Sequence, residues 1–282
     1  IGDPGVAKSA TLNFMAKISP KGRYVVGKSA TGAGLTATVV RDEYLRGWSL
    51  EAGSMVLANK GLLCIDELEK MDPGDRSAMH EAMEQQTVTI SKANVHATLR
   101  AETSVLAAAN PKFGRFDPFQ SIAQQIDLPP TLINRFDVIF PLRDLPNREK
   151  DELIATHVLH EHRKMGEEML ISKDLLRKYV AYAKQRIKPV LSDESVDEIK
   201  KFYVELRNTP VSGESAVRPI PISARQLQAL IRMSEASAKM RLSETVDSDD
   251  SKRAIEIMKY YLMQVGYDYE SKTFDIDRGT GG

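Results

Sequence analysis

The sequence has little cysteine, little tryptophan and no long apolar run. It contains one Cys and one Trp among 282 residues, so an internal disulfide framework is excluded and a reducing compartment is favoured. Cys64 lies within a short apolar run and is most simply a small core residue. No stretch approaches the roughly 18 apolar residues of a membrane span, and the first residues do not resemble a signal peptide. We therefore expect neither a membrane segment nor a secretory leader.

The chain also has no excess of either charge. Its 39 basic and 39 acidic residues cancel, so any contact with nucleic acid has to come from the local placement of Lys and Arg. The hydrophobic content of 42% is that of a soluble globular protein with one large or two modest domains. The 5 His are scattered, and the sequence contains no metal-binding cluster of Cys and His.

The first segment of the chain is close to a phosphate-binding loop. Gly2-Asp3-Pro4-Gly5-Val6-Ala7-Lys8-Ser9 matches the pattern Gly, four residues, Gly, Lys and Ser, except that Ala7 replaces the second Gly. In such a loop, backbone N–H groups and the start of the next helix face a triphosphate. Lys8 would then reach the outer phosphates and Ser9 would bind Mg²⁺. The alternative is a Gly-Pro turn that happens to precede a lysine.

Two acids follow an apolar run in the manner of a nucleotide-hydrolysing site. Gly61–Ile65 reads as a buried parallel strand, and Asp66 and Glu67 come directly after it. Ligands bind at the carboxyl ends of such strands. Asp66 would hold the Mg²⁺ shell, and Glu67 would polarise the attacking water. The alternative, that the two acids only cap the next helix, is weakened by the upstream loop.

Strand and helix patterns divide the chain into two parts. We expect an α/β part over 1–145 with inserted β-hairpins, a helical lid over 146–270 and a flexible linker over 271–282. Only Ile1 precedes the loop, where a buried strand is normally found, so we expect the chain to be a fragment. In the first part, strands are expected at Arg23–Val26, Thr103–Ala109 and Val138–Leu142, helices at Lys8–Ile18 and from Asp72-Pro73, and hairpin arms at 32–40 with 48–57 and at 87–91 with 95–100. In the lid, helices are expected at Arg148–His162, Lys173–Ile187, Asp193–Leu206, Ser223–Leu242 and Asp249–Val265.

Several other side chains are candidates for a functional role, each with a simpler alternative. Asn110 ends a predicted strand and could bind the attacking water or the γ-phosphate, or could only form the turn before Pro111. Arg135 precedes a strand and is either a surface ion pair or a group that reaches a neighbour's nucleotide. Arg225 lies at a helix start, where a cation is unfavourable, which indicates that it pairs with an anion elsewhere. Lys92, at the apex of the second hairpin, faces either solvent or a partner. Trp48 is expected near the tip of the first hairpin with Leu45 and Arg46, where it either packs on a neighbouring domain or faces DNA.

The order of these motifs resembles a known family. The loop with Ala7, the run Leu63-Cys64-Ile65-Asp66-Glu67, Ala108-Ala109-Asn110-Pro111 and Asn134-Arg135-Phe136-Asp137 are similar to the ATPase domain of minichromosome maintenance (MCM) replicative helicases, especially the archaeal ones. The resemblance covers nearly the whole chain, and the Ala variant of the loop is itself typical of that family. Asn134 replaces the Ser that is commoner in the family motif.

The resemblance implies an AAA+ P-loop NTPase fold, a parallel sheet flanked by helices and followed by a helical lid, in a homo-hexamer or double hexamer around DNA. It implies an ATP-dependent DNA helicase that uses Mg²⁺, works with other replication factors, and is cytoplasmic and chromosome-associated in archaea or nuclear in eukaryotes. The residues implied for ATP are Asp3, Pro4, Gly5, Val6, Ala7, Lys8, Ser9 and Asn110, those for the metal are Ser9 and Asp66, and those for catalysis are Glu67, Lys8, Asn110, Arg135 and Arg225. Arg135 and Arg225 would act across the subunit interface. Lys92, on a hairpin that is similar to the family's pre-sensor hairpin, would touch DNA.

Two other interpretations remain at this point. One is a non-motor ring subunit that binds nucleotide without productive hydrolysis, and Glu67, Asn110 and Arg135 argue against it. The other is a different AAA+ branch with an insertion in its second helix, which would use the hairpins on protein instead of DNA.

Overall fold

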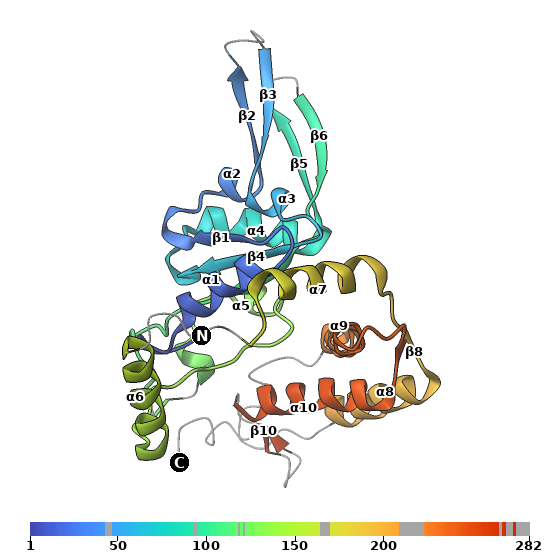
Figure 1. Ribbon diagram of the computed structural model, residues 1–282. Coiled ribbons are helices and arrows are strands. Elements are labelled where there is room, and N and C mark those ends of the chain that lie inside the picture. Colours follow the sequence, from blue (N-terminus) through green and yellow to red (C-terminus); the bar gives the residue numbers. More distant parts are fainter. Residues whose placement is uncertain are drawn as a thin grey trace.

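A computed structural model describes residues 1–42, 47–92, 95–117, 119–120, 122–163, 170–208, 223–264, 267–268 and 273–274 (Figure 1). Within these residues the strands are β1 (Arg23–Val26), β2 (Ala37–Asp42), β3 (Gly47–Ala52), β4 (Leu62–Asp66), β5 (Thr87–Lys92), β6 (Val95–Arg100), β7 (Ser104–Ala107), β8 (Val190–Leu191), β9 (Thr245–Val246), β10 (Tyr267–Asp268) and β11 (Thr273–Phe274). The α-helices are α1 (Lys8–Ile18), α2 (Gly32–Leu35), α3 (Ser54–Leu57), α4 (Pro73–Gln85), α5 (Pro130–Ile133), α6 (Arg148–Arg163), α7 (Lys173–Arg186), α8 (Asp193–Arg207), α9 (Ala224–Met240) and α10 (Ser248–Gln264). Short 3-10 helices are η1 (Gly27–Ser29), η2 (Leu68–Lys70) and η3 (Ile122–Gln125).

A parallel sheet carries the predicted site. Its order is β1–β4–β7, and β4 pairs with β1 on one side and β7 on the other. Leu12 of α1 packs with Cys64 on one face, whereas Leu63 and Ile65 join the cluster that includes Met79 of α4 on the other. Because alternate residues of β4 are buried on opposite faces, the strand reads as a continuous apolar run. The predicted α/β class, with helices flanking a parallel sheet, is confirmed.

The start of the chain extends this sheet beyond β7. The Gly2 amide donates to the oxygen of Ala109 at 3.0 Å, and the Leu142 amide donates to the oxygen of Ile1 at 2.8 Å. Gly2 and Leu142 form only an isolated parallel bridge, so the strand predicted over Val138–Leu142 is wrong in extent. The backbone amide hydrogen bonds there run only from Leu142 to Ile1 and from Asp3 to Leu142, among the described residues. The strand predicted over Thr103–Ala109 is likewise shorter, as β7.

Two β-hairpins project side by side from the same end of the α/β part (Figure 1). β2 pairs with β3 and β5 pairs with β6, both antiparallel. The first hairpin is shorter than predicted, because 32–35 and 54–57 are the helices α2 and α3. α2 begins where the Thr31 side chain accepts a hydrogen bond from the Gly34 amide, a local helix cap that competes with strand pairing. The predicted tip residues Leu45 and Arg46 lie outside the described residues.

The helical part is built around α8, α9 and α10. A buried cluster joins Ile199 and Phe202 of α8, Leu230 of α9 and Met258 of α10, which is the amphipathic packing that the helical spacing predicts. α7 lies between this bundle and α1, whereas α6 stands apart from it (Figure 1). The five predicted helices are present with ends shifted by a residue or two.

The predicted linker is only partly described. Within 271–282, Thr273–Phe274 pair with Tyr267–Asp268 as β11 and β10, so these two residues are a strand and not a free linker. The rest of that segment lies outside the described residues. None of the described helices combines the length and the apolarity that a bilayer crossing requires.

Candidate functional site

The loop before α1 has the backbone of a phosphate cradle. Gly5 has a φ of 90°, and Ala7, the last residue before α1, has a φ of 58° and a ψ of 24°. Ala7 therefore adopts the left-handed conformation that the usual Gly of this pattern takes without steric cost. Space is open around Gly5, where a Cβ would meet no atom within 4 Å outside the two adjacent residues. The loop thus turns sharply and leads directly into the N-terminus of α1, which favours anions.

Asp3 holds the loop in place through hydrogen bonds of its side chain. Its side chain is 4% exposed, and its two oxygens accept hydrogen bonds from the amides of Phe116 at 2.7 Å and Asp144 at 2.8 Å. Its own amide donates to Leu142. These contacts tie the loop to two later segments, so Asp3 supports the shape of the cradle. Its assignment as a residue that touches the nucleotide stays a prediction.

Lys8 lies among the acids that the sequence assigns to the site. Its Nζ donates to the backbone oxygens of Gly2 and Asp3, both at 2.6 Å. Desolvation lowers the pKa of Lys8 below its ordinary value, against the opposing charges of Glu69, Asp66 and Asp3. The fold therefore brings Lys8 and Asp66, 58 positions apart in the chain, into electrostatic reach of one another.

Asp66 is held at the carboxyl end of β4 by two hydrogen bonds. It is 6% exposed, and its Oδ1 accepts from the amide of Glu67 at 2.9 Å. Its Oδ2 accepts from the hydroxyl of Tyr24, on β1, also at 2.9 Å. Burial, together with the hydrogen bond to Asp66, raises the pKa of Tyr24 to about 12, so this hydroxyl is a stable donor near neutral pH.

Glu67 has an unusual backbone. Its φ of 51° and ψ of 46° are left-handed, a conformation that residues other than Gly adopt mainly where the surrounding structure imposes it. Its Oε1 accepts from the Nζ of Lys70 at 2.5 Å, and this bond raises the pKa of Lys70. Glu67 is thus engaged by a neighbouring lysine, Lys70.

Asn110 is paired with an acid that sequence reasoning missed. Its Nδ2 donates to the Oε1 of Glu69 at 2.8 Å, whereas the Oε2 of Glu69 is buried without a hydrogen-bond partner. The backbone oxygen of Glu69 accepts from Arg76. The sequence does carry a signal for Glu69, which is a third acid after the strand, following Asp66 and Glu67. Tyr24 carries no such signal, because a tyrosine within a short strand is ordinary strand composition.

The two arginines lie together, away from the loop. Arg135, whose side chain is 15% exposed, pairs with Glu84 near the end of α4. Arg225, at the start of α9, donates to the backbone oxygen of Asn134 at 2.9 Å. α4 covers the sheet face opposite α1, so these arginines are not gathered around Lys8 with Asp66, Glu69 and Asn110.

The hairpin residues are exposed. Lys92 is the last residue of β5, paired with Val95 across the hairpin, so it stands beside the tip and not at its apex as predicted. Trp48, on β3 opposite Arg41, is 54% exposed. Exposure leaves both side chains free to contact a partner.

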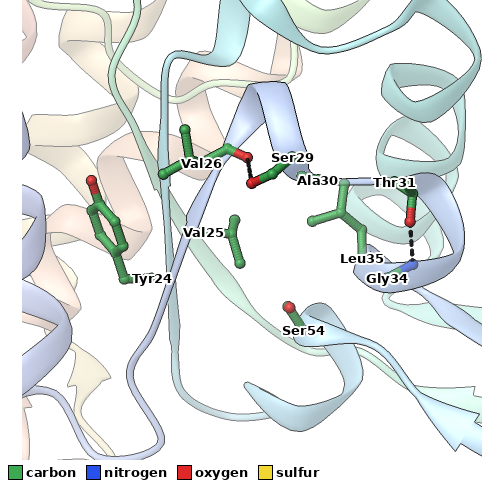
Figure 2. A pocket seen from close by; sticks show the side chains of 9 residues that line it. All are labelled: Tyr24, Val25, Val26, Ser29, Ala30, Thr31, Gly34, Leu35 and Ser54. Carbon is green, nitrogen blue, oxygen red and sulfur yellow. Dashed lines mark hydrogen bonds between the residues drawn. The ribbon is translucent and has the colours of Figure 1, made fainter.

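A pocket lies next to the site, at the outer edge of β1 (Figure 2). It has a volume of about 350 Å³, and Figure 2 shows Val25 and Leu35 between Tyr24 on one margin and Thr31 on the other. The lining mixes apolar side chains with the hydroxyls of Ser29, Thr31 and Ser54, and it contains none of the residues predicted for nucleotide. The candidate phosphate site is therefore the loop and not this pocket.

The residues that meet at the loop fit a magnesium nucleotide. Mg²⁺ is commonly held by one or two carboxylates together with phosphates and waters. Among the described residues no group of three His, Cys, Asp or Glu could hold a metal ion. The exposed Ser9 hydroxyl and the Asp66 carboxylate could each give one oxygen to an ion that a bound phosphate also holds. The open loop and the N-terminus of α1 supply the anion site.

Two family models together match most of the chain. A family model described as the MCM P-loop domain matches residues 1–162, and one described as the MCM AAA-lid domain matches residues 174–262. The first match covers the sheet, its hairpins and nearly all of α6, and the second covers the helices from α7 to α10.

Similar proteins come from archaea and eukaryotes. The chain is 48% identical to "Minichromosome maintenance protein MCM" of Saccharolobus solfataricus, covering 98% of this chain and 40% of that protein. It is 42% identical to "DNA replication licensing factor MCM4" of Arabidopsis thaliana, covering 98% and 33%. It is 41% identical to "DNA replication licensing factor mcm7" of Schizosaccharomyces pombe, covering 97% and 37%. The chain thus spans between a third and two fifths of the length of these relatives.

Proposed function

The chain belongs to the MCM family, and from this premise we propose that it is the ATP-hydrolysing motor of a ring-shaped DNA helicase that acts in replication. The observation that carries the proposal is the meeting of Lys8, Asp66, Glu69 and Asn110 beside an open phosphate loop. We further propose that residues 1–145 bind and hydrolyse nucleotide and that 146–270 act as the lid.

Each residue of the site has a distinct task in this proposal. Lys8 and the amides of the loop bind the phosphates, and Lys8 exchanges the backbone oxygens of Gly2 and Asp3 for phosphate oxygens. Ser9 and Asp66 hold Mg²⁺, which when bound neutralises phosphate charge. Glu67 accepts the proton of the attacking water. Glu67 has to leave Lys70 to do so.

Asn110 positions the water or the γ-phosphate, and its orientation is fixed by Glu69. A carboxylate only accepts hydrogen bonds, so the amide nitrogen of Asn110 has to face Glu69. The amide oxygen then faces away and is available as an acceptor for water.

The two arginines complete the site of a neighbouring subunit. Their position supports this, because Arg135 is tied to Glu84 and Arg225 to Asn134, apart from the loop of their own chain. A guanidinium that enters from a second copy stabilises the charge of the transferring phosphoryl group. The functional unit is then a homo-hexamer or a double hexamer, working with other replication factors.

The hairpins are the parts that grip DNA. Lys92 and Trp48 stand exposed near the ends of two hairpins that project in the same direction (Figure 1). A lysine contacts the phosphate backbone without reading sequence, as translocation requires. The protein would act on chromosomes, in the cytoplasm of an archaeal cell or in the nucleus of a eukaryotic one.

The test is DNA-stimulated ATP hydrolysis with and without Glu67→Gln. Loss of the base is expected to lower the rate about 10²- to 10⁴-fold, while ATP binding is retained. Glu256→Gln, an exposed change on α10, serves as the matched control. Hydrolysis that proceeds unchanged in Glu67→Gln would remove Glu67 as the base, and hydrolysis by the wild type that DNA fails to stimulate would favour a motor acting on protein.

A further inference from the structure

Tyr24 contacts Asp66 across the outer edge of the sheet. In the register of β1 and β4, Tyr24 lies opposite Cys64 and Val26 lies opposite Asp66. Tyr24 and Val26 share one face because strand residues alternate, so the Tyr24 ring extends along that face toward the end of β4. Its hydroxyl reaches the Oδ2 of Asp66 at 2.9 Å.

This contact fixes the plane of the Asp66 carboxylate. The terminal torsion of an aspartate is broad and roughly two-fold, so a single hydrogen bond leaves its oxygens free to rotate. Here Oδ1 accepts from the amide of Glu67, the next residue in the chain, and Oδ2 accepts from the hydroxyl of Tyr24 on β1. Each oxygen keeps a second lone pair, which is available to a metal ion or to a water of its shell.

The Tyr24 hydroxyl is not part of the adjacent pocket. Figure 2 shows Tyr24 at the margin of that pocket, with its hydroxyl directed away from Leu35 and Ser54. The ring is 37% exposed, so it contributes little to a buried core. The hydrogen bond to Asp66 is therefore the specific interaction that distinguishes Tyr at this position from Phe.

We propose that Tyr24 is a positioning residue, which holds the Asp66 carboxylate in the orientation that receives the divalent cation of the nucleotide. The inference rests on the proposed function, because it takes Asp66 as a metal residue. Groups that orient a metal-binding carboxylate or imidazole typically change metal affinity about 10- to 100-fold when they are removed. Tyr24 is expected to fall in this range, without contacting the nucleotide itself.

The experiment compares Tyr24→Phe with the wild-type protein in the binding of ATP, measured by calorimetry over a series of Mg²⁺ concentrations. The Mg²⁺ concentration for half-maximal enhancement of ATP binding is expected to rise about tenfold. ATP affinity in EDTA is expected to stay within about twofold, since Lys8 and the loop are untouched. Tyr179→Phe is the matched control, because it also removes one hydroxyl bond, from Tyr179 to the Met240 oxygen at 2.7 Å on the lid.

Asp66→Asn and the double variant Tyr24→Phe/Asp66→Asn separate the proposed metal role of Asp66 from the proposed positioning role of Tyr24. The double variant is expected to show the Mg²⁺ dependence of Asp66→Asn alone, since Tyr24 acts through Asp66. A normal Mg²⁺ response in Tyr24→Phe, with an altered one in Asp66→Asn, would overturn the inference and leave the proposed function intact. A normal response in Asp66→Asn would instead overturn the proposed metal site. A weaker response in Tyr24→Phe that accompanies a lower thermal midpoint than in Tyr179→Phe would mark damage to the fold, and would also count against positioning.

Discussion

The guanidinium of Arg225 donates a hydrogen bond to the backbone oxygen of Asn134, the residue before Arg135. About two turns further along α9, Arg232 holds both carboxylate oxygens of Asp137, at 3.0 and 2.6 Å. A bidentate pair of this kind fixes geometry as well as contributing energy. The lid is thus fastened to the segment that carries Arg135, and we expect the two to move as one body.

Arg135→Ala is expected to abolish hydrolysis while ATP binding survives. The loss should be about 10³- to 10⁵-fold, the range for an arginine that stabilises a transferring phosphoryl group. Steady-state hydrolysis and calorimetric ATP binding check it, with the exposed Arg177→Ala of α7 as the control.

Mixing Arg135→Ala with Lys8→Ala tests whether the arginine acts across an interface. In mixed assemblies some sites combine an intact loop with an intact arginine, so part of the activity should return. The absence of any recovery, in mixtures that still assemble, would contradict a shared site.

Lys92→Ala is expected to weaken DNA binding and to leave ATP binding unchanged. Removing one phosphate contact lowers the slope of log affinity against log salt by about one per subunit. Titrations with fluorescent DNA at several salt concentrations measure this slope, and Lys201→Ala, an exposed lysine on α8, is the control. An unchanged slope and affinity would exclude Lys92 from the DNA contact.

Ala7→Gly is expected to stabilise the protein. An L-residue in the left-handed region costs roughly 1–2 kcal/mol, and replacing Ala7 with Gly removes this cost. The gain in stability is offset in part, because Gly has more conformational entropy in the unfolded chain. The net gain should be about 0.5–1 kcal/mol, or a rise of roughly 1–4 °C in the thermal midpoint. Ala10→Gly, in the ordinary helical backbone of α1, should have the opposite sign. Equal destabilisation by both changes would show that the Ala7 conformation carries no strain.

Asp250 makes the lid sensitive to acid. Burial would raise the pKa of Asp250, but hydrogen bonds from Arg241, Ser237 and the Asp247 amide outweigh it and lower the pKa from 3.8 to about 2. Because the folded pKa lies below the unfolded one, the stabilisation is full above about pH 4 and is lost as the pH falls toward 2.

Urea denaturation at pH 7 and at pH 2.5 measures this effect. Asp250→Asn should cost about 2 kcal/mol at pH 7, and the gap to the wild type should narrow at the lower pH. Asp249→Asn, at a neighbouring side chain that is 86% exposed, should cost little at either pH. A gap that is constant with pH would contradict the role of the Asp250 charge.

Local rules explain why much of the fold could be predicted. Lys8–Ile18 was predicted as a helix with the observed bounds, and Arg23–Val26 was predicted as the observed strand, because their spacing and flanking turns specify them. The α2 and α3 helices were missed, since each is four residues long and too short to show a helical period. The pairing of Leu142 with Gly2 could not be predicted, because the two residues lie at opposite ends of the α/β part in the sequence.

The candidate site also contains residues that could be predicted from the sequence and residues that could not. Lys8, Ser9, Asp66, Glu67 and Asn110 could be proposed from short motifs, since each follows a loop or strand whose pattern is local. Their roles, and those of Arg135, Arg225 and Lys92, stay predictions. The acid that orients Asn110 and the hydroxyl that orients Asp66 were not proposed, because neither Glu69 nor Tyr24 belongs to a motif that the spacing alone marks.

The sequence by itself determined the phosphate loop, the acidic strand end, the hairpin arms and the helical lid, because each depends on residues within a few positions of one another. Only the tertiary structure decided which side chains meet. Tyr24 and Asp66 are 42 positions apart, and they meet because β1 and β4 are neighbours in the sheet. Glu69 and Asn110 are 41 positions apart, and they meet because they follow the neighbouring strands β4 and β7. Strand order and register set those meetings, and both are fixed by burial of the whole sheet rather than by any local pattern.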